Sequence, residues 1–133
     1  MTGASVTVGG SNCTSFNLVS ATQATCVTPA NSAGAEDVVF TNADGQSTTL
    51  VNGYTYRPAP TLASVSPPAG ALAGGTSVTL TGTNFNAGAT VTFDGLSCTA
   101  VSVDSSTQIT CLTPAHAIGA VNVVVTNTDT QSV

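Results

Sequence analysis

Cysteines are the residues in this sequence whose type and spacing best support covalent chemistry. Cys13 and Cys26 are separated by the same number of residues as Cys98 and Cys111, and a turn sequence lies within each pair. Each pair can face across one hairpin, so we expect two disulfides and an oxidising, extracellular location. Closing a loop of this size stabilises a small domain by roughly 3 kcal/mol. The alternatives are buried free thiols in a cytosolic protein, and a zinc site, for which clustered ligands are lacking.

Groups for acid–base catalysis or metal binding are few. His116 is the single histidine, and a nucleophilic triad needs a base that a carboxylate holds in place. The sequence shows no such arrangement, so we expect no catalytic residue, no cofactor and no enzyme activity. Asp44 is a lone acid in a turn-like stretch, whereas calcium takes about six to eight oxygen ligands. We therefore expect a turn there and no metal site.

The charge balance excludes whole classes of partner. The chain has no lysine, Arg57 is its one arginine, and six acids give a net charge of −5. Such a surface cannot neutralise a phosphate backbone or an anionic membrane, so we expect no nucleic-acid binding and no membrane insertion. The 38 serines and threonines keep the surface wet in place of charges, which suits the outside of a cell.

An internal repeat organises the chain. Shifted by 85 residues, residues 3–48 align without gaps with residues 88–133, and 24 of the 46 pairs are identical. The chain therefore enters and leaves the repeating unit in its middle. We expect residues 1–59 to be the C-terminal part of one unit, with its early strands missing. Residues 60–133 are then the N-terminal and middle part of the next, with its last strand missing.

Short period-2 runs, separated by Gly, Pro and Asp-Gly signals, mark the elements of one unit. No stretch has helical spacing of apolar residues over three turns. Seven short strands rich in Val and Thr predict an all-β, two-sheet sandwich of immunoglobulin type. The expected strands cover residues 62–65, 78–81, 90–93, 98–103, 108–112 and 121–126, with a seventh borrowed from the first copy at residues 49–56.

Several of these segments resemble, in order, the motifs of IPT/TIG domains. The opening lies in residues 60–70 (PTLASVSPPAG) and 73–85 (AGGTSVTLTGTNF), and later motifs in 109–114 (ITCLTP) and 121–127 (VNVVVTN). The resemblance covers nearly the whole chain as two incomplete copies. It implies an immunoglobulin-like fold found in surface receptors, some transcription factors, some polysaccharide-acting enzymes and bacterial surface arrays. It implies no catalytic residue.

Exposed hydroxyl and amide side chains are candidates for glycosylation. Asn12 begins the one Asn-x-Ser/Thr sequon, and its aligned residue is Ser97. Residues that flank an inward-facing strand cysteine point outward. The alternative is that threonine is simply a good strand residue. The candidates are Asn12, Thr14, Ser97, Thr99, Ser105, Ser106 and Thr107.

The junction between the copies is short and rich in proline. Pro58 and Pro60 restrain the link, so we expect neighbouring units to stack in a nearly fixed direction. Tyr54 and Tyr56, followed by Arg57, lie on one face of the preceding strand, where they form either core packing or a sugar-binding platform.

These features favour a structural module over a catalyst. We expect part of an extracellular fibre or stalk of head-to-tail sandwiches, whose partners are neighbouring units or copies of itself and covalent glycans. The alternative is a carbohydrate- or receptor-binding module of a secreted protein, which would need an exposed aromatic platform.

Overall fold

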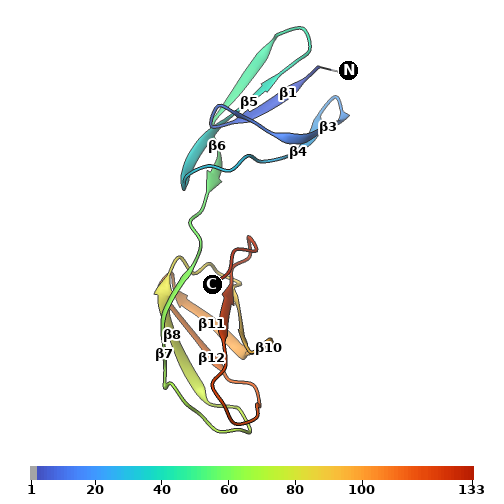
Figure 1. Cartoon of the computed structure of the whole chain (residues 1–133). Helices are drawn as coiled ribbons and strands as arrows, with labels where there is room; N and C mark the ends of the chain where they lie inside the picture. The colour runs from blue at the N-terminus through green and yellow to red at the C-terminus, as the bar shows by residue number, and fades with distance from the viewer. Residues whose placement is uncertain (1–2) are drawn as a thin grey trace. The chain divides into compact units, whose positions relative to one another are not determined.

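The computed structural model describes residues 3–133, which divide after Pro58 into two compact units, 3–58 and 59–133 (Figure 1). Every regular element in this part of the chain is a β-strand, so the expected all-β fold is confirmed. The first unit contains β1 (Ser5–Val8), β2 (Ser11–Asn12), β3 (Thr14–Ser20), β4 (Gln23–Val27), β5 (Gly34–Thr41) and β6 (Ser47–Tyr56). The second contains β7 (Thr61–Ser66), β8 (Ser77–Thr83), β9 (Thr90–Phe93), β10 (Leu96–Ser97), β11 (Thr99–Ser105), β12 (Gln108–Leu112) and β13 (Val123–Thr126).

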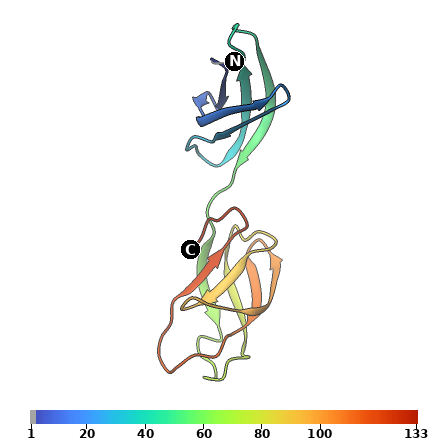
Figure 2. The same cartoon turned by 90° about the vertical axis from the view of Figure 1, so that its right-hand side faces the viewer.

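The second unit is a sandwich of two antiparallel sheets, with strand orders β11-β12-β8-β7 and β10-β9-β13 (Figure 2). Alternation along β8 turns Val78 and Leu80 inward, and Leu80 lies opposite Ile109 of β12. Leu80 and Ile109 are both completely buried, because each sheet covers the apolar face of the other. The core is made of Val78, Leu80, Phe85, Ala89, Val91, Cys98, Ile109, Cys111 and Val125.

The first unit has the sheets β2-β1-β5-β6 and β3-β4. In the part of the chain that the structure describes, β4 pairs with β3 alone, whereas the aligned β12 pairs with both β11 and β8. Among the described residues of this unit, Val8 is the one buried hydrophobic side chain. Ala24 is exposed although its aligned residue, Ile109, is fully buried.

One expected strand is shorter than the sequence pattern indicates. Of the expected strand 121–126, only the part from Val123 onward forms a strand. The aligned strand of the first unit, β5, begins earlier, at Gly34, which aligns with Gly119. In the first unit, residues 34–36 pair with the second half of β6. The second unit contains no such partner strand, so residues 119–122 have no ladder to hold them in strand geometry.

The turn after β5 recurs after β13 in the second unit. Asp44 accepts a hydrogen bond from the Gln46 amide, just as Asp129 does from the Gln131 amide. The lone acid expected to form a turn does so. Thr130, however, has the left-handed backbone conformation that Gly45 has in the first unit. The φ angle is 71° at Thr130 and 85° at Gly45.

Replacing Thr130 with glycine is expected to stabilise the second unit by about 1 kcal/mol, because a β-branched residue is strained in this region. Differential scanning calorimetry would record a higher midpoint for that unit. The reciprocal change, Gly45→Thr, serves as the matched control and should lower the stability of the first unit. Equal midpoints for Thr130→Gly and the parent chain would contradict this assignment of strain.

Candidate functional site

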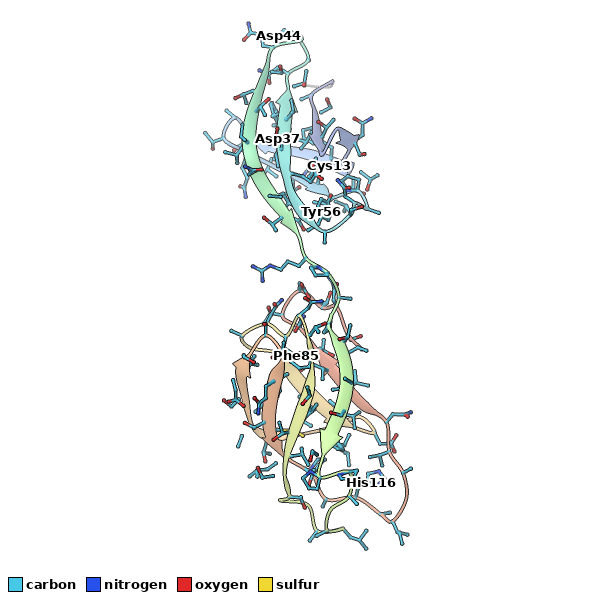
Figure 3. All side chains as sticks on the ribbon, turned by 90° about the vertical axis from the view of Figure 1, so that its left-hand side faces the viewer. Cys13, Asp37, Asp44, Tyr56, Phe85 and His116 are labelled. Carbon is cyan, nitrogen blue, oxygen red and sulfur yellow. A yellow bond between two sulfur atoms is a disulfide. The ribbon has the colours of Figure 1, made fainter. Side chains whose placement is uncertain are left out.

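The first cysteine pair is a disulfide. Cys13 lies between β2 and β3 and Cys26 lies in β4, and their Cα atoms are 5.8 Å apart, within the usual range for a bridge. Figure 3 labels Cys13 within the first unit. The bond ties the β1–β2 hairpin to the smaller sheet. It stabilises a unit that has little buried core.

The second cysteine pair lies in the core of the second unit. The Cys98 and Cys111 side chains are buried, and their sulfur atoms are 2.7 Å apart, closer than two unbonded sulfur atoms approach. This separation is compatible with the expected bridge. As free thiols, both would have a pKa raised by burial, and Cys98 would raise that of Cys111 further. A bridge in this unit stays a prediction. Residues 3–133 hold no cluster of three or more His, Cys, Asp or Glu suited to a metal.

The glycosylation candidates are accessible. The seven side chains flank the cysteines or lie at the β11–β12 turn, and the structure exposes each of them. The Ser105 hydroxyl accepts a hydrogen bond from the Thr107 amide and lies 3.1 Å from the Thr107 hydroxyl. The same arrangement joins Ser20 and Thr22. These hydroxyls therefore also have a local structural role. Their modification stays a prediction.

The tyrosines at the end of β6 are held within the first unit. The Tyr56 hydroxyl donates a 2.6 Å hydrogen bond to the Pro29 carbonyl, which ties β6 to the segment after β4. The Tyr54 and Tyr56 rings are 5.0 Å apart and meet edge to face. Tyr56 is half-buried and Tyr54 exposed, so the pair presents no flat, two-ring surface.

Removing the hydroxyl in Tyr56→Phe is expected to destabilise the first unit by about 1 kcal/mol, the net value of one hydrogen bond. Denaturant unfolding monitored by circular dichroism measures the loss. Tyr54→Phe changes the exposed ring of the same pair and should leave stability unchanged. A loss in Tyr54→Phe as large as that in Tyr56→Phe would show that the hydroxyl bond is not the cause.

An apolar groove of about 410 Å³ lies in the second unit. Its walls come from the β7–β8 connection (Pro67–Leu72) and from the segment between β12 and β13 (Pro114–Val121), with Phe93 contributing from β9. Sequence reasoning did not find this groove. The signal that could have found it is the alignment of Gly119-Ala120 with Gly34-Ala35, residues that β6 covers in the first unit.

His116 is a loop residue that lines this groove. Figure 3 labels it at one end of the second unit. Its Nδ1 lies 2.9 Å from the Ala117 carbonyl and its Nε2 lies 3.3 Å from Asp94. The backbone hydrogen bond and the nearby carboxylate both raise the pKa of His116. Both contacts are exposed, and His116 lies in a loop, which is the placement expected for this residue.

Comparisons with known proteins support the fold at both units. The model of the IPT/TIG domain matches residues 1–56 and 60–133. Two structures of the full extracellular region of plexin A4 are 26% and 25% identical over 98% of the chain, with TM-scores of 0.58 and 0.63. The chain covers only 14% and 12% of those plexin chains.

A third structure is SGBP-B of the Bacteroides ovatus mixed-linkage glucan utilization locus, in complex with a mixed-linkage heptasaccharide. It is 24% identical over 97% of this chain and 33% of its own, with a TM-score of 0.48. No curated protein matches the sequence. Residues 3–133 include no helix long and apolar enough to cross a membrane. Because the family model matches nearly every residue, as two domains in succession, the chain belongs to the IPT/TIG domain family.

Proposed function

We propose that this chain is a structural module of an extracellular fibre or stalk built from head-to-tail IPT/TIG sandwiches. The observation that carries the proposal is that two domains of one family follow each other directly and repeat each other closely. Residues 3–48 align without gaps with residues 88–133, and 24 of the 46 pairs are identical. Close repetition of neighbouring domains is the sequence signature of an array.

Two further features support an extracellular setting. The Cys13–Cys26 disulfide is of a kind that persists in oxidising compartments. The surface has few charges and many hydroxyls, and the plexin A4 structures to which the chain is similar are of an extracellular region. In this proposal the module extends the fibre and resists proteases. The paired strands and the proline-containing link at Pro58 and Pro60 provide both properties.

Electron microscopy of the natural protein tests the proposal. A regular succession of domain-sized beads is expected along each particle. Particles with one or two such beads attached to a large globular body would overturn it. Tandem mass spectrometry of the same material then shows whether sugars occupy the sequon at Asn12 or the exposed hydroxyls, and an unmodified mass would remove the glycan part of the proposal.

The alternative role, binding of a carbohydrate or receptor, is favoured by one observation. The Tyr54 ring is 42% exposed beside Tyr56. Stacking on a sugar would make binding on a glycan array depend on that ring. Array signal that disappears in Tyr54→Ala would move the assignment toward a binding module.

A further inference from the structure

The chain enters the second unit through a short segment, Ala59–Thr61, that residues of the same unit hold. The holding residues, Gly82–Asn84, are the end of β8 and the residue that follows it. Figure 3 labels the next residue, Phe85, near the end of the unit at which the chain enters. These residues close the family motif at residues 73–85, to which the proposed function assigns no role.

Side chains on both sides of Pro60 hold the entering chain. Before Pro60, the Asn84 side-chain amide donates a 3.0 Å hydrogen bond to the Ala59 carbonyl. After Pro60, the Thr61 hydroxyl lies 2.8 Å from the Thr83 hydroxyl, and these two residues pair at the start of β7. Pro60 itself is buried. The chain is therefore held at each of the three residues by which it enters the unit.

Gly82 lets the entering strand approach closely. A Cβ atom at this position would overlap the Thr61 carbonyl and would also meet the Phe85 ring. The Gly82 amide donates a 3.0 Å hydrogen bond to the Thr107 carbonyl, and the Phe85 amide donates a 2.9 Å bond to the Ser106 carbonyl. The segment that holds the entering chain is thus itself fixed to the turn between β11 and β12.

A second asparagine, Asn127, positions the backbone of Asn84. Asn127 is 3% exposed, and its side chain donates a 2.8 Å hydrogen bond to the Asn84 carbonyl. The same side chain accepts a 3.0 Å hydrogen bond from the Asn86 amide. Asn84 has a φ angle of 59°, in the left-handed region that asparagine adopts more readily than most residues. The donor of Asn84 is therefore held in place where it meets the Ala59 carbonyl.

We propose that Asn84 is an anchoring residue that fixes the direction in which the chain enters the second unit. Pro58 and Pro60 confine the link to extended conformations, but a broad range of backbone angles remains within that region. The hydrogen bond from Asn84 to the Ala59 carbonyl selects one direction from this range. The role of the anchor in extension rests on the proposed function, because a fixed entry direction matters where successive domains extend a fibre.

Two substitutions remove the donor of Asn84 in different ways. Asn84→Gly removes the side chain and keeps the left-handed conformation, which glycine adopts freely. Asn84→Asp keeps the shape of the side chain, but a carboxylate only accepts hydrogen bonds. In both variants we expect the NMR order parameter of the Ala59 amide to fall from about 0.85 to below about 0.6, while the Phe85 amide stays rigid.

Asn86→Asp is the matched control. Asn86 enters these contacts through its backbone amide, so the change places the same charge in the same loop and keeps the Asn84 donor. The Ala59 amide should stay as rigid as in the parent chain. A loss of rigidity in Asn86→Asp equal to that in Asn84→Asp would contradict the anchor, because charge alone would then explain the effect.

Acidification separates anchoring from a general effect of the substitutions. At about pH 3 the introduced carboxyl group of Asn84→Asp is protonated, and its O–H can again donate to the Ala59 carbonyl. Rigidity of the Ala59 amide that returns in Asn84→Asp, but not in Asn84→Gly, supports the anchor. An Ala59 amide that is equally rigid in the parent chain and in both variants overturns it, and so does a loss that acid restores equally in both.

The outcomes stay distinct from those of the fibre proposal. Beaded natural particles, together with an Ala59 amide that is indifferent to Asn84, would keep the fibre and reject the anchor. An anchored Ala59 in a protein whose natural particles lack beads would keep the anchor and reject the fibre.

Discussion

Leu80→Ala is expected to lower the free energy of unfolding of the second unit by about 2 to 5 kcal/mol. Leu80 is completely buried and lies opposite the equally buried Ile109 of the neighbouring strand. Truncation removes the transfer energy of the lost methyl and methylene groups and leaves a cavity that a close-packed sandwich cannot fill. Because small domains are stable by about 5 to 15 kcal/mol, this loss is a large share of the total.

Calorimetry of the whole chain measures the effect, with the first unit as an internal reference. Leu96→Ala is the matched control, since the Leu96 side chain in the same unit is 47% exposed and its loss should cost far less. Similar losses from Leu80→Ala and Leu96→Ala would mean that the core of the second unit is not the one described.

Much of this fold follows from the sequence alone. Short runs of β-branched and apolar residues, with ends marked by turn residues, are enough to locate β7, β8, β9, β11 and β12, and the alternation of burial is clearest in β8 and β12. The repeat adds what alternation cannot provide. It shows that the turn at Asn42–Gln46 recurs at Asn127–Gln131, and the two turns share their backbone hydrogen bonds.

The sequence could not predict features that depend on an absent neighbour. Val121 and Asn122 belong to a β pattern, yet they form no strand, since strand geometry at this edge depends on a partner. In the same way, Ala24 aligns with the fully buried Ile109, but in the first unit no strand pairs with β4 on the side where β8 pairs with β12, and Ala24 is exposed. The groove was missed for the same reason, because nothing local in residues 67–72 or 114–121 indicates that a strand is missing between them.

Equal spacing predicts equal placement of the two cysteine pairs, and each pair does bring its sulfur atoms together. The surroundings of the pairs differ. Cys13 and Cys26 are half-buried, whereas Cys98 and Cys111 are buried in the core beside Ile109 and Val91. The sequence could not predict this difference in burial, because it depends on the strands that pack over each pair.

Breaking the Cys13–Cys26 bond is expected to unfold the first unit while the second stays folded. The bridge closes a loop across 13 residues and contributes roughly 3 kcal/mol. In the first unit, Val8 is the one buried hydrophobic side chain among the described residues, so little packing remains to offset that loss. Cys13→Ser combined with Cys26→Ser should therefore abolish its cooperative transition. Tyrosine fluorescence reports on this unit specifically, because both tyrosines, Tyr54 and Tyr56, belong to it.

The matched control is the double change Cys98→Ala with Cys111→Ala. If Cys98 and Cys111 are thiols, this double change lowers the stability of the second unit only through lost packing. The tyrosine signal of the first unit should then stay intact. Alkylation of the denatured, unreduced parent chain counts the thiols directly: no modified cysteine fits a bridge in each unit, and two modified cysteines fit free thiols at Cys98 and Cys111. A first unit that still unfolds cooperatively without Cys13 and Cys26 would show that its two sheets hold together through packing alone, against the burial pattern described.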